Sequence, residues 1–129
     1  MAAAGLLRPV AVHIKTALGF LADRKSPDYR NCIKESISAV EAACKLIAKD
    51  DRATLDAAIK RLKSRVGLHP ALEAAFIKMY AYTSDADGIR HALMEQPTLS
   101  FEDAKFMLVS CSAFVNYLTA KSARRGPGA

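Results

Sequence analysis

The chain has 129 residues, a net charge of +6 and an apolar content of 51%. This length suits one domain rather than two, and the apolar fraction is high enough to bury a core without disulfides or metals. Charged residues make up 25% of the chain, which is ordinary for a globular domain and argues against overall disorder. The positive charge indicates either a solubility feature or an anionic partner such as nucleic acid.

The three cysteines, Cys32, Cys44 and Cys111, are expected to be buried free thiols in a reducing cytoplasm. Cys32 and Cys44 lie on one predicted helix, about 18 Å apart at the helical rise, so they cannot form a disulfide with each other. No cysteine or histidine spacing matches a metal site, and we expect neither a metal nor a cofactor. The apolar runs are too short to cross a membrane, and the N-terminal segment lacks the pattern of a secretion signal.

The first two predicted helices are defined by apolar residues that recur every three or four positions. The first runs from about Pro9 to Asp23, with an inward stripe of Val10, Ile14, Ala17, Leu18 and Leu21. The second has Ser26 as its N-cap and Pro27 in its first position, and it ends near Lys49. Its inward residues are Tyr29, Ile33, Ile37, Val40, Cys44 and Ile47.

The next two predicted helices are shorter. One covers about Ala53 to Val66 and ends at Gly67, with Leu55, Ile59, Leu62 and Val66 inward. The other begins near Pro70 and is expected to bury Leu72, Phe76, Met79 and Tyr80. Residues 82–88 have the composition of a turn, and a short helix is predicted over 89–94.

The last predicted helix has a clear start, because Ser100 to Asp103 match a capping box with Asp in place of the usual Glu. We expect it to run to about Lys121, followed by a flexible basic tail over 122–129. Apolar residues cover most of its circumference, which predicts a helix at the centre of the bundle or one buried against a second subunit.

These elements predict one all-α domain over 1–129, with an ordered core over about 9–121. Its architecture is an antiparallel bundle of about five helices. The excess apolar surface of the last helix further predicts a two-fold homodimer.

One segment before the last helix combines two acids, an arginine and a histidine: Asp85, Asp87, Arg90 and His91. Arginine can stabilise a phosphoryl anion, and histidine can move a proton near neutral pH. Together these groups meet the requirements of metal-free RNA cleavage. Alternatively, the two aspartates cap the short helix and Arg90 pairs with one of them.

A second candidate set is basic and lies near the end of the third predicted helix: Lys60, Arg61, Lys63 and Arg65. Cations at this position either complement the helix dipole or contact the phosphate backbone of RNA. Arg8 and His13 are interpreted as unrelated surface residues, and His69 as a structural residue at the start of the fourth helix.

Three segments resemble the helical domain of AbiJ-type abortive-infection proteins, which is similar to the HEPN superfamily. They are PDYRNCIKESISAVEAACKLI, LHPALEAAFIKMYAYTSDADGIRHALM and FEDAKFMLVSCSAFVNYL, and the resemblance covers about Pro9 to Lys121. It implies a helical bundle, often dimeric, that acts in bacterial defence on RNA or with a partner protein of the defence system. Many HEPN members are metal-independent ribonucleases.

The active HEPN members use an arginine and a histidine roughly four to six residues apart, at the start of the last long helix, and two copies of this pair meet at the dimer interface. In this sequence Arg90 and His91 are adjacent. Two functions therefore stay open, namely the binding or cleavage of RNA and a non-catalytic role in dimerisation or protein interaction.

Overall fold

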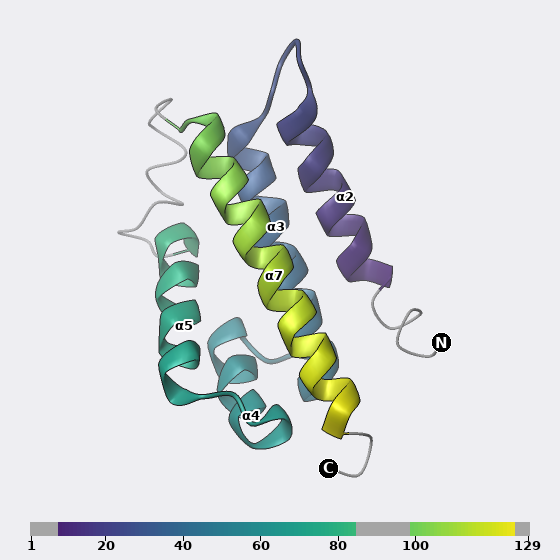
Figure 1. Ribbon diagram of the computed structural model, residues 1–129, viewed down its shortest axis with the longest axis vertical. Coiled ribbons are helices and arrows are strands. Elements are labelled where there is room, and N and C mark those ends of the chain that lie inside the picture. Colours follow the sequence, from purple (N-terminus) through teal and green to yellow (C-terminus); the bar gives the residue numbers. More distant parts are fainter. Residues whose placement is uncertain (1–7, 85–98, 126–129) are drawn as a thin grey trace.

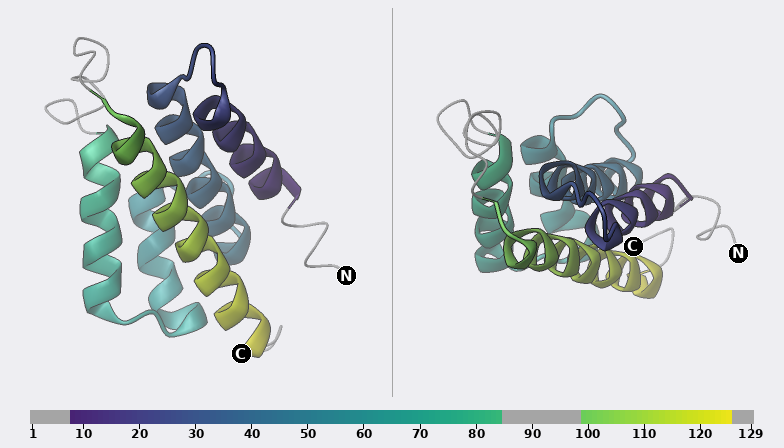
Figure 2. Two further views of the ribbon diagram at one scale, coloured as in Figure 1. Left: turned by 45° about the horizontal axis from the view of Figure 1, so that its top comes forward. Right: turned by 90° about the horizontal axis from the view of Figure 1, so that it is seen from above.

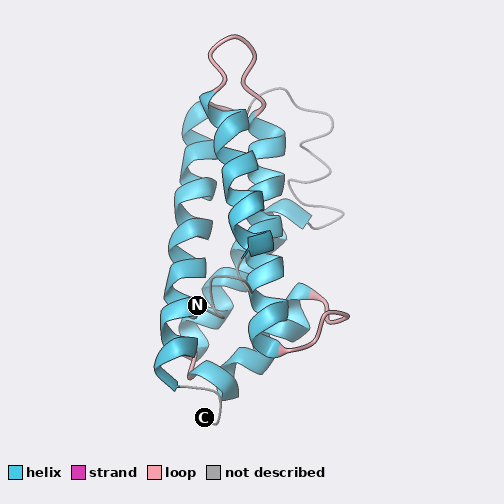
Figure 3. Ribbon diagram, turned by 90° about the vertical axis from the view of Figure 1, so that its right-hand side faces the viewer, coloured by secondary structure: helices cyan, strands magenta, loops and turns pink. Residues whose placement is uncertain are grey.

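The computed structural model describes residues 8–84 and 99–125, which form five α-helices (Figure 1). They are α2 (Arg8–Ala22), α3 (Tyr29–Ala48), α4 (Leu55–Val66), α5 (Pro70–Ser84) and α7 (Phe101–Arg125). The structure is 83% helical and has no strand among the described residues, which confirms the predicted all-α fold (Figure 3). The helix predicted over 89–94 lies outside the described residues.

Helices α2, α3 and α7 lie side by side along the length of the molecule, while α4 and α5 pack beside them (Figures 1 and 2). α2 and α3 are antiparallel neighbours joined by a short connection. α3 and α7 run in the same direction, whereas α5 runs in the opposite direction (Figure 1). Where α3 and α7 begin, the rings of Tyr29 and Phe101 meet edge to face, with their centroids 6.4 Å apart.

Helix α3 is the centre of the core, since it packs against both α2 and α7. The predicted inward residues Ile33, Ile37, Val40 and Cys44 are buried, whereas Tyr29 is half-buried. The inward residues predicted for α4 are buried without exception. On α7, the residues that face the core are Ala104, Met107, Leu108, Cys111, Val115 and Leu118.

Two leucines predicted to face inward are exposed instead, which corrects the expected helix faces. Leu72 is 45% exposed, because the inward face of α5 passes through Glu73, Phe76 and Thr83. One residue along a helix is a rotation of about 100°, which is enough to turn Leu72 to the solvent. Leu18 is 52% exposed for the same reason, because Ala17 occupies the centre of the buried face of α2.

The start of α3 also differs from the prediction, because Asp28 rather than Ser26 is the N-cap. The Asp28 carboxylate accepts the backbone N–H of Asn31 at 3.0 Å and the side-chain amide of Asn31 at 2.7 Å. Ser26 instead belongs to the preceding turn, where its N–H donates to Asp23 at 3.0 Å. α3 therefore begins two residues later than predicted, and the two carboxylate oxygens of its N-cap Asp28 accept both hydrogen bonds from Asn31.

The predicted capping box at the start of α7 is confirmed in both halves. The N–H of Asp103 donates to the Ser100 hydroxyl at 3.2 Å, and the Asp103 carboxylate accepts the N–H of Ser100 at 3.0 Å. These hydrogen bonds to the backbone N–H and side chain of Ser100 lower the pKa of Asp103. At its other end α7 continues to Arg125, beyond the predicted end at Lys121.

Candidate functional site

The candidate catalytic residues Asp85, Asp87, Arg90 and His91 lie outside the described residues. The described chain before them is the end of α5, which extends to Ser84. Residues 82–84 are therefore helical, and the turn predicted to begin at residue 82 is wrong for these three positions. Thr83 is buried in this last turn, and its hydroxyl donates to the carbonyl of Tyr80 at 2.9 Å.

Three of the four candidate RNA-binding cations form ion pairs with carboxylates of the same chain. The pairs are Lys60 with Asp56 at 3.2 Å, Arg61 with Asp50 at 2.9 Å, and Lys63 with Glu73 at 3.4 Å. The fourth cation, Arg65, is exposed in the last turn of α4. These pairs balance much of the local charge and tie α4 to the preceding connection and to α5, which favours the structural interpretation of this basic set.

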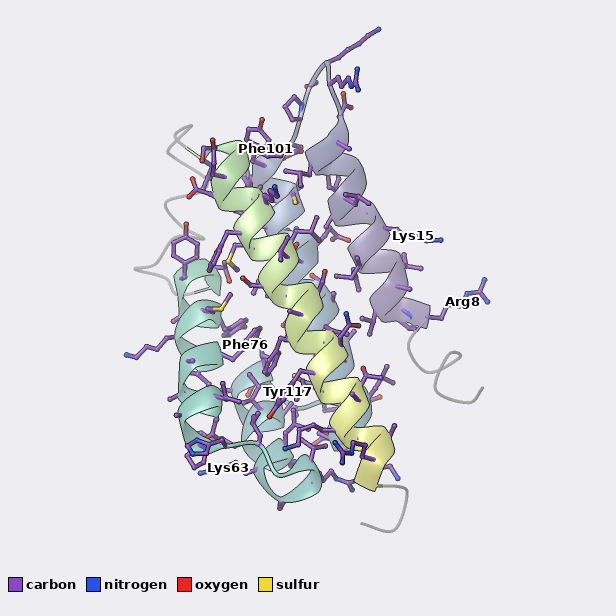
Figure 4. The ribbon with its side chains drawn as sticks, viewed as in Figure 1. Arg8, Lys15, Lys63, Phe76, Phe101 and Tyr117 are labelled. Atoms are coloured by element: carbon purple, nitrogen blue, oxygen red, sulfur yellow. The ribbon has the colours of Figure 1, made fainter. Side chains whose placement is uncertain are left out.

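The other basic residues singled out from the sequence do not form a site. Nδ1 of His13 lies 3.0 Å from Oε1 of Glu35, so this side chain links α2 to α3. Arg8 begins α2 and points away from the body of the molecule (Figure 4). Nδ1 of His69 accepts the N–H of Ala71 at 3.0 Å, which confirms its structural role at the start of α5.

The three cysteines are free and buried, as predicted. Burial raises the pKa of Cys44 and of Cys111 to about 12, and that of Cys32 to about 11. At neutral pH these thiols are protonated and therefore weak nucleophiles. The described residues contain no group of three or more histidine, cysteine or acidic side chains able to hold a metal ion. None of the helices in ranges 8–84 and 99–125 has the length and apolar character needed to cross a membrane.

Besides the residues that face the core, α7 carries a stripe on its outward side, which we call the outer stripe. All members of the outer stripe are exposed. Its members are Glu102, Phe106, Val109, Ala113, Asn116, Ala120 and Ala123. Phe106 is 62% exposed and Val109 is 57% exposed. The members alternate between steps of four and three residues, the spacing with which one helix packs against another in a coiled coil. The outer stripe therefore has the spacing of a helix-packing surface.

The outer stripe has no helix packed on it among the described residues. Seen from above, α7 forms the front edge of the molecule, with the other helices behind it or to one side (Figure 2). Other aromatic side chains of α7 have ring partners within the chain: Phe114 stacks on Phe76 with centroids 3.8 Å apart, and Phe101 meets Tyr29. Phe106 has no aromatic partner in the described part of the chain, although it is the most exposed of the large apolar residues there.

Opposite charges mark the two ends of the outer stripe: one belongs to its first member, Glu102, and the other to Arg124, which directly follows its last member, Ala123. Glu102 lies in the first turn of α7, and Arg124 lies at its end. Neighbouring charged groups are engaged elsewhere, since Asp103 caps the helix and Nζ of Lys121 donates to the carbonyl of Gly67 at 3.3 Å. Within the described residues, Glu102 and Arg124 take part in no ion pair. Both charges thus remain accessible to a partner.

No known family model, curated protein or solved structure matches this chain. The resemblance to AbiJ-type and HEPN domains therefore stays a hypothesis based on the three sequence segments. The sequence pattern indicates that α7 is apolar nearly all round, but it does not by itself separate the core-facing residues from the outer stripe. The signal that could have done so is the second set of positions with coiled-coil spacing, between the residues that face the core.

Proposed function

We propose that the chain is a non-catalytic dimerisation module, in which the outer stripe of α7 binds a second copy of the same chain. The observation that carries this proposal is the exposure of Phe106 and Val109 on adjacent turns of one stripe, at 62% and 57%. Single exposed apolar residues are common on protein surfaces and need no explanation. Two large ones within a stripe that has coiled-coil spacing favour helix pairing instead.

Burial of these side chains supplies the driving force for the association. Full burial of a phenylalanine or valine side chain stabilises by about 1.5–3 kcal/mol relative to exposure. A two-fold interface uses the same surface on both subunits, so each such contribution counts twice. The alanines along the outer stripe add little area, but they allow the backbones of two helices to approach closely.

The alternative function is binding or cleavage of RNA by a domain of the abortive-infection type, for which Arg90 and His91 remain the candidate residues. An RNA-cleavage assay in the presence of chelator, with the parent and the His91→Ala variant, separates this function from the proposed one. The dimerisation module predicts no cleavage by either protein. Cleavage by the parent that falls by about 10²–10⁴ in the variant, the usual cost of losing a proton-transfer group, would favour the ribonuclease.

The direct test of the proposed function is sedimentation velocity with the parent and two variants, Phe106→Ser and Leu18→Ser. Leu18 is a matched control, because it is 52% exposed but lies on α2. Between about 1 and 100 µM, the range suited to a small interface, the parent should pass from monomer to dimer. Phe106→Ser should raise the Kd at least about tenfold, as expected for a buried aromatic anchor. Leu18→Ser should leave it unchanged.

A parent that stays monomeric over this whole range would contradict the proposal. Equal weakening by both variants would contradict it too, because the contact would then not be specific to the outer stripe.

A further inference from the structure

The sizes of the side chains along the outer stripe differ between its two halves. The large residues Phe106 and Val109 lie in the first half, whereas Ala120 and Ala123 lie in the second. If two copies of α7 paired in parallel, each residue would meet its own counterpart. Two phenylalanines would then face each other at one level and two alanines at another, which leaves the second level underpacked. Antiparallel pairing can instead place Phe106 of each copy against the partner's Ala120.

The charges at the ends of the outer stripe select the same direction. Parallel pairing would bring Glu102 near the partner's Glu102 and Arg124 near the partner's Arg124, and both contacts are repulsive. Antiparallel pairing brings Glu102 near the partner's Arg124 at each end of the interface. It also aligns the two helix dipoles in opposite directions.

One register meets both criteria. The pair of Glu102 with Arg124 and the pair of Phe106 with Ala120 have the same midpoint in the sequence, which is Ala113. Ala113 is exposed and small, so its position permits two helix axes to approach to about 8 Å. We therefore infer that two copies of the chain pair α7 against α7 in antiparallel orientation, with Ala113 at the two-fold axis. This inference rests on the proposed dimerisation.

The register has a consequence for the ends of the dimer. The two copies of Ser100, which precede α7, would lie at opposite ends of the interface. They would be about 40 Å apart, because each is about 13 residues from the centre at a rise of about 1.5 Å per residue. This arrangement differs from the one that the HEPN resemblance implies, in which residues at the start of the last long helix meet across the interface.

Disulfide trapping tests the register in the full chain with two matched variants, Ala113→Cys and Ala120→Cys. Antiparallel pairing about Ala113 brings together the two thiols introduced at that position, so oxidation should convert most of the dimer into a covalent dimer. The two Cα atoms at position 120 would lie about 21 Å apart along the axis, beyond the limit of about 7 Å for a disulfide. The parent is the background control, because its buried thiols have raised pKa values.

Efficient cross-linking of both variants would show parallel pairing and overturn the inference. If neither variant cross-links while the parent still sediments as a dimer, the register is wrong but the dimerisation module stands. A monomeric parent overturns both.

Charge reversal gives an independent test of the same register by sedimentation. Glu102→Arg and Arg124→Glu should each raise the Kd about 3- to 10-fold, because each creates two like-charge contacts at the interface. The double variant restores opposite charges at both ends and should return to within about twofold of the parent. A double variant weaker than either single variant would exclude the pairing of Glu102 with the partner's Arg124.

Discussion

Helices α3 and α7 are both long and rich in apolar residues, yet they relate to solvent in different ways. The exposed positions of α3 include the charged residues Arg30 and Lys34, and its most exposed large apolar residue is Leu46 at 36%. The outward side of α7 instead carries Phe106 and Val109, each more than half exposed. The two helices share one core, but only α3 has an outward side typical of a helix whose apolar residues are all used by its own chain.

This difference shows that the apolar content of a helix does not by itself reveal which of its residues are buried within the chain. The sequence of α7 allowed either a central helix or one buried against a second subunit, and the structure shows a buried stripe and a separate exposed stripe on the same helix. The buried stripe, through Met107 and Cys111, is explained by packing within the chain. The large residues of the outer stripe are more than half exposed and contribute little to that packing, which is why we propose that the stripe serves association.

The largest expected effect is the loss of stability when a buried residue of α3 is truncated, compared with an exposed residue of α7. Ile33 on α3 is fully buried, so Ile33→Ala should lower the free energy of unfolding by about 2–5 kcal/mol. Val109→Ala on α7 should change it by less than about 0.5 kcal/mol when the chain is dilute enough to be monomeric, because this side chain is in solvent. Urea unfolding followed by circular dichroism measures both. A large loss in the Val109 variant under those conditions would mean that the outer stripe is covered within the chain.

A smaller effect is expected at the start of α7. Ser100→Ala removes the hydroxyl that accepts the N–H of Asp103 and should cost about 1 kcal/mol at neutral pH. The pKa of Asp103 is lower in the folded state than in the unfolded state, so the ionised carboxylate stabilises the fold. This stabilisation is present above the unfolded pKa of about 3.9, and it is lost as the pH falls through the folded-state pKa. The difference between parent and variant should therefore narrow below about pH 4. Thermal melts at several pH values check this, and a difference that is constant with pH would contradict it.

The smallest expected effect lies at the end of α3. Lys49 adopts a left-handed backbone conformation with φ of 59°, which is costly for a residue other than glycine. Lys49→Gly relieves this strain but also adds conformational entropy to the unfolded chain, which offsets part of the gain. We therefore expect the free energy of unfolding to rise by at most about 0.5–1 kcal/mol. Arg52→Gly, in the adjacent connection, is the control and should not stabilise. A destabilised Lys49→Gly variant would show that the lysine side chain contributes more than the backbone strain costs.

Much of the fold was predictable because its determinants are local. Periodic apolar residues located the helices, Gly67 adopts the left-handed conformation expected at the end of α4, and the capping box at Ser100 was found from four residues. The errors at Leu18 and Leu72 have a common cause. Both lie one residue away from the true centre of an inward face, which depends on packing between helices and not on spacing within one helix.

The candidate site was less predictable for a different reason. The basic residues of α4 could be named from the sequence, but their ion pairs depend on Asp50 and Glu73, which lie on other elements. Exposure of Phe106 likewise depends on which side of α7 the core occupies. Spacing within the sequence could supply candidate stripes, and only the packing of the other helices showed which stripe was left open.

The central claim is that α7 pairs in antiparallel orientation with α7 of a second copy, and an isotope-filtered NOE experiment on a mixture of labelled and unlabelled chain tests it most directly. Within one chain, Phe106 and Ala120 are separated by about 21 Å along the helix, far too great a distance for an NOE. We predict an intermolecular NOE between the Phe106 ring of one copy and the Ala120 methyl group of the other at concentrations where the dimer forms. A spectrum with no intermolecular NOE from Phe106, or with one between the two Phe106 rings, would contradict the account.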